Sequence, residues 1–221
     1  VCENAQQIAE TSLAVAAKLT ESEFGFVGEL KADGRLHTLA WRAPDRQGCS
    51  TRGATSASRL PDAYLRTLWY AVIQNDRSLI VNEPATFAAH LDASQVPPSA
   101  TSLLAVPLRY GDNTIGMLVL GNRENEYDLT EQRAAETLSV SFVEAWMRKC
   151  AEQALGLNEA RLDALWRLGQ MTESSSKAIT DFALEEAVRL TKSELGYLAF
   201  MNDDESVLTM HSWSKTAMKR C

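Results

Sequence analysis

The stretch SEFGFVGELKADGRLHTLAWRAPDRQGC, Ser22–Cys49, decides the fold of this protein, because a closely similar stretch, SELGYLAFMNDDESVLTMHSWSKTAMKRC, returns at Ser193–Cys221. The similarity extends upstream, where Asn4 aligns with Ser175 at an offset of 171 residues, and one inserted residue later raises the offset to 172. A repeat of this length is far longer than the roughly 20–50 residues of a solenoid unit. We therefore interpret it as a tandem domain plus its linker.

Each copy is predicted to form a helix followed by a β-hairpin. In the first copy, apolar residues between Asn4 and Thr20 recur at helical spacing, and the pair Asp33-Gly34 separates two segments rich in strand-forming residues. An Asp-Gly pair in this context is typical of a hairpin turn. The predicted strands are Phe24–Lys31 and Leu36–Arg42 in the first copy and Leu195–Met201 and Val207–Trp213 in the second.

The residues between the two copies predict further elements in a readable order. In chain order they are a helix at Pro61–Arg77, a strand at Ser78–Glu83, a loop at Pro84–Ala100, two strands within Thr101–Arg123 and a long helix that begins near Leu129. The two strands within Thr101–Arg123 are apolar on both faces, which is typical of central strands that are covered on each side. Asp128 and Thr130 are candidate N-caps for the long helix.

This order of elements resembles a GAF domain of the microbial sensor type, which precedes histidine kinases and cyclases in signalling proteins. The segments that carry the resemblance are SEFGFVGEL, IVNE, TSLLAVPL and IGMLVLGNRENEYDLTEQ. It implies an α+β fold with a central antiparallel sheet of five or six strands, terminal helices on one face and a ligand pocket on the other. We therefore expect a GAF domain at 4–150, a helical linker at 151–174 and the truncated start of a second GAF domain at 175–221.

The resemblance also implies which residues border the pocket. They come from the first two strands, the covering helix and the ends of the next two strands: Phe26, Gly28, Trp41, Trp69, Val72, Asn82, Ser102 and Leu104. Aromatic and apolar walls with a few polar groups suit a small organic ligand. The same residues are also compatible with a filled core, so both interpretations stay open. Ligand identity is not fixed, because GAF domains bind cyclic nucleotides, tetrapyrroles, haem, small metabolites or nothing.

One sequence comparison with the family argues against a cyclic nucleotide. The segment GNRENEY stands where cyclic-nucleotide-binding members carry an Asn-Lys-Phe-Asp-Glu set, and only Asn122 and Arg123 agree in part. The alternative for Asn122 is a structural one, in which a side chain at the end of a strand ties down a turn.

Candidate catalytic residues are not found in the sequence. His37, His90 and His211 are unclustered, and neither a nucleophile-elbow pattern nor a glycine-rich phosphate loop is present. We expect no catalytic residue, no metal site and no enzymatic activity in these residues. A GAF-type methionine sulfoxide reductase is a less favoured alternative, since it needs several cysteines around one pocket and only Cys49 is expected there.

Two cysteines are candidates for a cofactor or redox role. Cys49 follows Trp41 by eight residues, and Cys221 follows Trp213 at the same spacing. Some GAF domains hold haem or an open-chain tetrapyrrole through a cysteine, and a thiolate is a soft ligand for iron. A bound cofactor, a redox-active thiol and an inert loop cysteine all remain open.

Composition bounds the partners. The 221 residues carry a net charge of −7, which disfavours binding to nucleic acid or to an anionic membrane surface. No run of 18 or more apolar residues and no signal-peptide pattern occurs, so we expect a cytoplasmic segment without a membrane contact.

In the linker, apolar residues alternate in steps of four and three, which is typical of a coiled-coil seam with a polar residue at one core position. The seam residues are Ala151, Leu155, Asn158, Leu162 and Leu165.

The resemblance implies a sensory or regulatory GAF module of a signal-transduction protein, and the parent protein that we expect is a two-component sensor histidine kinase in a phosphorelay. The module is expected to bind a small ligand or to relay a signal through a helical linker in a homodimer. The alternatives are a ligand-free structural dimerisation module and a haem or redox sensor that acts through Cys49. For the linker itself, the alternative is that its apolar stripe packs on its own sheet.

Overall fold

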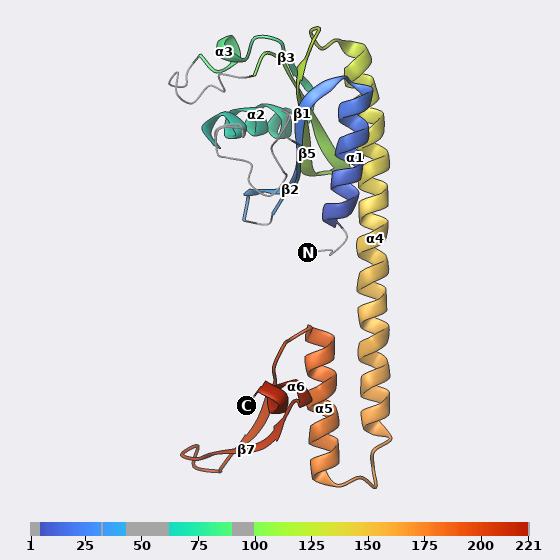
Figure 1. Ribbon diagram of the computed structural model, residues 1–221, viewed down its shortest axis with the longest axis vertical. Helices are drawn as coiled ribbons and strands as arrows, with labels where there is room; N and C mark the ends of the chain where they lie inside the picture. The colour runs from blue at the N-terminus through green and yellow to red at the C-terminus, as the bar shows by residue number, and fades with distance from the viewer. Residues whose placement is uncertain (1–4, 32, 43–61, 90–99, 221) are drawn as a thin grey trace. The chain divides into compact units, whose positions relative to one another are not determined.

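The computed structural model describes residues 5–31, 33–42, 62–89 and 100–220 (Figure 1). The chain divides into two units, Val1–Cys150 and Ala151–Cys221, and each is described here by itself. Three residues that the sequence raised as candidates for a role lie outside the described residues. They are Cys49, His90 and Cys221.

The first unit is built on a five-stranded antiparallel sheet in the order β2-β1-β5-β4-β3. Its strands are β1 (Ser22–Leu30), β2 (Leu36–Arg42), β3 (Leu79–Val81), β4 (Leu103–Tyr110) and β5 (Asn113–Arg123). The strands β1, β5 and β4 lie inside the sheet and are buried over most of their length on both faces. This confirms the prediction of an α+β fold whose central strands are covered on each side.

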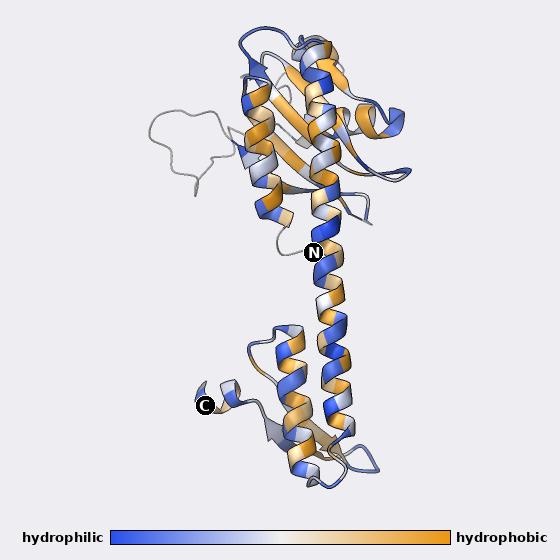
Figure 2. Cartoon of the chain, turned by 90° about the vertical axis from the view of Figure 1, so that its right-hand side faces the viewer, coloured by the Kyte–Doolittle hydropathy of each residue, from blue (hydrophilic) through white to orange (hydrophobic). Residues whose placement is uncertain are grey.

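Helices cover both faces of this sheet. Helix α1 (Ala5–Leu19) and the start of α4 (Leu129–Gly169) lie side by side on one face, and α2 (Asp62–Asn75) and α3 (Pro84–Phe87) lie on the other (Figure 1). Figure 2 shows the hydrophobic strands behind α1 and α4. The α1/α4 face is packed by residues such as Leu13, Leu104 and Phe142, and the α2 face by Phe26, Leu68 and Met117.

Helix α4 begins with a capping box. The carboxylate of Asp128 accepts a hydrogen bond from the backbone N–H of Thr130 at 2.6 Å, and the Glu131 carboxylate accepts one from the N–H of Asp128 at 3.0 Å. The first of these bonds holds the pKa of Asp128 below its ordinary value. Of the two predicted N-caps, Asp128 therefore fills the role. The helix continues through Gly156 and ends at Gly169.

The second unit consists of the C-terminal part of α4, α5 (Ser176–Thr191), β6 (Tyr197–Met201), β7 (Leu208–Trp213) and the short helix α6 (Lys215–Arg220). Helix α5 runs alongside α4 (Figure 1), with Ala164 buried and the Arg167 guanidinium 5.2 Å from the centre of the Phe182 ring. The strands β6 and β7 form an antiparallel two-stranded sheet. The sequence predicted α5 and the hairpin but not α6. In the first unit it predicted a loop from Pro84, where the structure has the short helix α3.

Candidate functional site

The α2 face of the first unit carries an aromatic cluster built on β1 and β2. Phe24 and Phe26 alternate along β1 and therefore share a face, and Trp41 lies opposite Phe26 in the β1–β2 register. The Trp41 ring stacks on both, with centroid distances of 6.2 Å to Phe24 and 6.1 Å to Phe26. Gly28 continues the same face, where an added Cβ would lie 2.7 Å from Cγ of Leu36. These residues form the floor of the candidate site.

Helix α2 covers this floor with side chains at helical spacing. Tyr64, Leu68 and Val72 recur every four residues and are fully buried, and Trp69 packs beside them. The Tyr64 ring meets Phe87 of α3 edge-on at 6.0 Å. Burial raises the pKa of Tyr64 to about 12, so its hydroxyl stays neutral at physiological pH.

Two indole groups on this face have buried N–H donors without a partner in the described part of the chain. The Nε1 atoms of Trp41 and Trp69 are buried and have no hydrogen-bond partner among the described residues. An indole N–H is a donor only, and leaving a buried donor unpaired costs about 1–3 kcal/mol. The arrangement therefore favours a bound group that presents hydrogen-bond acceptors to an aromatic surface.

The structure brings together five of the eight residues that the resemblance implied. Phe26, Gly28, Trp41, Trp69 and Val72 share the α2 face. Sequence reasoning missed other residues that pack there, among them Tyr64 and Phe24. Tyr64 could have been found from its four-residue spacing to Leu68 and Val72, and Phe24 from its alternation with Phe26.

Asn82 has a structural task instead. Its side-chain amide donates a hydrogen bond to the backbone carbonyl of Tyr127 at 3.1 Å and accepts one from the Tyr127 N–H at 3.1 Å. This pair of bonds ties the end of β3 to the turn that enters α4. Nothing in its geometry directs the side chain to the aromatic cluster.

The placement predicted for Leu104 is wrong. Leu104 is fully buried in the cluster that α1 and α4 cover, whereas its neighbours Leu103 and Ala105 belong to the α2 face. Alternation along β4 groups Ser102 with Leu104 rather than with Leu103. Ser102 is buried, and its hydroxyl has no hydrogen-bond partner in the described part of the chain.

Asn122 fits its structural alternative. It adopts a left-handed backbone conformation with φ of 58°, and its side-chain oxygen accepts a hydrogen bond from the Thr101 N–H at 2.9 Å. The side chain thus ties the end of β5 to the residues that enter β4. Among the histidines, His37 is exposed, and His211 has its Nδ1 atom 3.0 Å from the Thr180 hydroxyl in the second unit.

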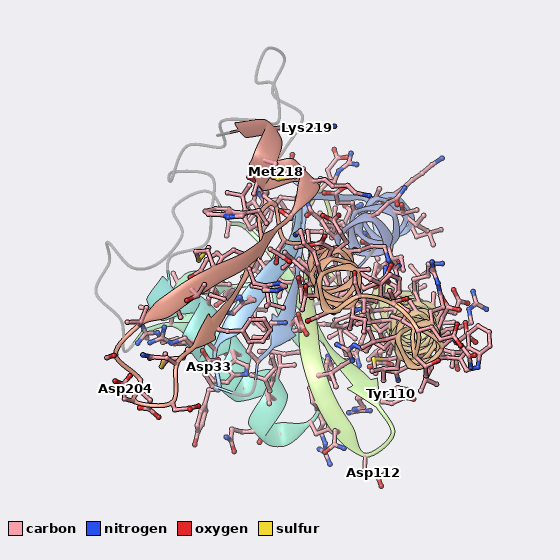
Figure 3. The ribbon with its side chains drawn as sticks, turned by 90° about the horizontal axis from the view of Figure 1, so that it is seen from below. Asp33, Tyr110, Asp112, Asp204, Met218 and Lys219 are labelled. Atoms are coloured by element: carbon pink, nitrogen blue, oxygen red, sulfur yellow. The ribbon has the colours of Figure 1, made fainter. Side chains whose placement is uncertain are left out.

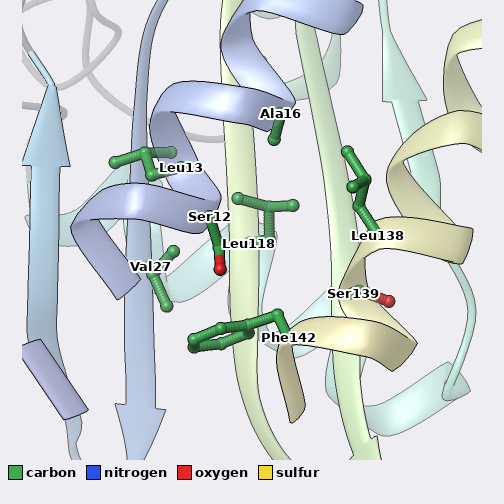
Figure 4. Close-up of a pocket in the computed structure, with 8 residues that line it drawn as sticks. All are labelled: Ser12, Leu13, Ala16, Val27, Leu118, Leu138, Ser139 and Phe142. Carbon is green, nitrogen blue, oxygen red and sulfur yellow. The ribbon is translucent and has the colours of Figure 1, made fainter. Parts of the chain in front are cut away.

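On the opposite face of the sheet, a small cavity lies at the junction of α1, β1, β5 and α4 (Figure 4). Its volume is about 10 Å³, enough for one water molecule at most. It is lined by Ser12, Leu13, Ala16, Val27, Leu118, Leu138, Ser139 and Phe142. The cavity is too small for an organic ligand.

A chain of hydroxyl groups connects the start of β1 to the turn before α4. The Thr20 and Ser22 hydroxyls are 2.6 Å apart, and the Ser22 and Tyr127 hydroxyls are also 2.6 Å apart. All three residues are buried. Burial raises the pKa of Tyr127 to about 12.

The described residues contain no group of three or more His, Cys, Asp or Glu side chains that could hold a metal ion.

None of the helices in the described ranges has the length and apolar character needed to cross a membrane.

Among curated proteins, the chain is similar to the methyl sulfide methyltransferase-associated sensor of Methanosarcina acetivorans, with 64% identity over 74 residues. The aligned part is 34% of this chain and 7% of that protein, so the chain spans less than a tenth of its relative.

Solved structures show the same fold at low sequence identity. The photoproduct state of GAF3 from Slr1393 of Synechocystis sp. PCC6803 is 15% identical, with a TM-score of 0.53 over 67% of this chain and 98% of that chain. The blue-light absorbing form of the Thermosynechococcus elongatus PixJ GAF domain is 18% identical, with a TM-score of 0.50 over 69% of this chain and 91% of that chain. A sequence model described as the GAF domain matches residues 2–146. This match spans well over half of the chain, and the chain belongs to the GAF domain family.

Proposed function

We propose that this chain is a sensory module of a signal-transduction protein, and that the α2 face of its GAF domain binds a small planar ligand. The unpartnered, buried indole N–H groups of Trp41 and Trp69 carry the proposal. They lie in an aromatic cluster that offers flat surfaces for stacking. The name of the Methanosarcina acetivorans relative, a sensor, supports the functional class. The parent protein that we propose is a two-component sensor histidine kinase, with its catalytic residues outside this chain.

The ligand chemistry follows from the donors. Two N–H groups without an acceptor favour a heteroaromatic compound with carbonyl oxygens or ring nitrogens. The side chains of Phe24, Phe26, Leu68 and Met117 on the α2 face are apolar, so the ligand that we propose is uncharged in the part that contacts them.

The proposed relay passes from the α2 face to α4 by way of β3. This strand follows α2 directly and is tied at both ends to α4 or to the turn before it. The Ser78 hydroxyl donates to the Glu136 carboxylate at 2.6 Å, and Asn82 holds the backbone of Tyr127. A ligand that shifts α2 therefore acts on β3, and β3 acts on α4.

The output of the relay is a parallel homodimer through α4. Leu155, Leu162 and Leu165 of the predicted seam are all exposed, and so is Asn158. Packing of the stripe on its own sheet accounts for Leu138 and Phe142 but not for these leucines. A second copy of the same helix would cover them in the manner of a coiled coil.

Binding of planar heterocycles tests the proposed function. The probes are fragments that carry carbonyl or ring-nitrogen acceptors, and the controls are hydrocarbons of the same size without acceptors. Isothermal titration should give saturable binding of at least one heterocycle, and Trp69→Phe should weaken it about fivefold to fiftyfold, because one hydrogen bond is lost.

Trp146→Phe is the matched control, since Trp146 also has a buried, unpartnered Nε1 within the described residues but lies on the α1/α4 face. Equal weakening by both variants would contradict the site. Failure of every heterocycle, with dimer formation intact, would instead favour the ligand-free dimerisation module.

A further inference from the structure

The second unit repeats the opening of the GAF fold residue by residue. In the first unit Phe26 pairs with Trp41 across β1 and β2, and in the second Tyr197 pairs with Trp213 across β6 and β7. The ring centroids are 6.1 Å apart in both pairs. The two ladders are also interrupted by a register shift at the same point, between Val27 and Gly28 in one and between Leu198 and Ala199 in the other.

The two hairpin turns share a left-handed residue and a backbone hydrogen bond. Gly34 adopts φ of 76° and donates its N–H to the Lys31 carbonyl at 2.9 Å, while Glu205 adopts φ of 57° and donates to the Asn202 carbonyl at 3.0 Å. Figure 3 labels Asp33 and Asp204, which precede these residues in the two turns. A non-glycine residue in the left-handed region is uncommon, so this agreement is specific.

The passage from helix to first strand is repeated as well. Glu21 and Lys192 have φ of 53° and 54°, each just after its helix. The hydroxyls that flank them are hydrogen-bonded to each other in both copies, at 2.6 Å between Thr20 and Ser22 and at 2.7 Å between Thr191 and Ser193.

The copies differ in what covers them. In the first unit the second edge of β1 pairs with β5, whereas the sheet of the second unit, as far as the structure describes it, contains β6 and β7 alone. Phe24 and Phe26 are 6% and 2% exposed, but their counterparts Leu195 and Tyr197 are 50% and 63% exposed.

The hydroxyl pair differs in the same way. In the first unit Ser22 meets the Tyr127 hydroxyl and is buried. Thr191 and Ser193 are both exposed.

We propose that the free edge of β6 binds an apolar strand of the β5 type that is followed by a tyrosine. The edge of β1 that pairs with β5 indicates the chemistry of the strand that would bind to β6. An antiparallel apolar strand pairs with β6, and its following tyrosine places a hydroxyl against Ser193, as Tyr127 does against Ser22. The inference rests on the repeat and is independent of ligand binding at the α2 face.

Glycine is required at one point of this strand. A Cβ on Gly116 of β5 would collide with the backbone carbonyl oxygen of Gly28, next to the register shift in β1. Ala199 stands at the same place beside the shift in β6. Since backbone cannot give way as a side chain can, the occupant needs a glycine where its backbone approaches Ala199.

A peptide with the sequence of residues 113–128 of this chain is the probe, because it contains β5 and Tyr127. Added to the full chain, it should bind saturably and protect backbone amides of residues 197–201 from hydrogen exchange. The same peptide with Gly116→Val should bind at least about tenfold more weakly, and the chain variant Thr191→Val with Ser193→Ala should weaken the parent peptide to a smaller extent.

Three outcomes would overturn the proposal. One is the absence of protection at residues 197–201 at up to about 1 mM peptide, where millimolar binding would still be seen. Another is equal binding of the Gly116→Val peptide. The third is protection of residues 197–201 in the chain alone that grows with protein concentration, because the edge would then be taken by a second copy.

Discussion

Tyr127 joins three parts of the first unit. Its hydroxyl meets Ser22 at the start of β1, its backbone is held by Asn82 at the end of β3, and it lies two residues before α4. The side chain is 3% exposed, and burial raises its pKa to about 12. A single residue thus couples strand packing to the entry of the long helix, and its neutral hydroxyl is part of the folded state.

The Tyr127 hydroxyl predicts a loss of stability at high pH. Because its pKa is raised in the folded protein, the unfolded chain releases the proton first, near its ordinary pKa of about 10. The contribution is therefore fully present below pH 10 and is lost between about pH 10 and 12, with a slope of at most about 1.4 kcal/mol per pH unit.

Chemical denaturation at a series of pH values checks this. Tyr127→Phe should flatten the fall in the free energy of unfolding above pH 10, leaving the part due to Tyr64, whose pKa burial also raises to about 12. The exposed Tyr70→Phe is the control and should leave the curve unchanged. An identical fall in the Tyr127→Phe variant would show that this hydroxyl is not the cause.

At the scale of secondary structure, β3 is a short strand with a connecting role. Its three residues pair with β4, but the residues at its two ends hold α4 and the preceding turn through Ser78 and Asn82. The strand therefore links the helix that covers the candidate site to the helix that leaves the domain.

Asn82→Ala should lower the free energy of unfolding by about 1–3 kcal/mol, because both backbone groups of Tyr127 lose their partner. Urea denaturation measures the change. Asn125→Ala, at an exposed site in the same turn, should stay within about 0.5 kcal/mol of the parent. Equal stability of the two variants would show that the hydrogen bonds between Asn82 and Tyr127 do not stabilise the protein.

Most of the element order could be predicted from the sequence because the longer elements leave a local signal, whereas the short helices α3 and α6 were not predicted. The capping residue Asp128, the Asp33-Gly34 turn and the two strands that are apolar on both faces are all visible in the chain. The face of Leu104 could not be predicted in this way. Where both alternating sets of a strand are apolar, periodicity does not say which set meets which helix.

The polar features of the site were equally out of reach. Whether the indole groups of Trp41 and Trp69 find a partner depends on tertiary neighbours, and Asn82 gave no signal of its bonds to Tyr127, which lies 45 residues away. Five of the eight residues that the family layout implied for the site do share the α2 face, since that layout fixes which strands and helix meet.

For the molecule as a whole, self-association is the property that the α4 seam predicts. Sedimentation velocity should show a dimer of the full chain at micromolar concentration, and Leu162→Asp should weaken it about tenfold or more, since a charge would enter an apolar seam. Leu129→Asp, a similarly exposed position on α4 outside the seam, should leave the dimer intact. A monomeric parent chain, or an equal loss of dimer in both variants, would contradict a dimer through the α4 seam.

The α2 face of this GAF domain is the ligand site that we propose. Its most direct test is the indole N–H region of a nitrogen-15 correlation spectrum, where each of the five tryptophans gives one signal. Adding a planar heterocycle that binds should shift the signals of Trp41 and Trp69 and leave that of Trp146, on the opposite face, in place. Shifts of Trp146 with unchanged signals from Trp41 and Trp69 would contradict the claim.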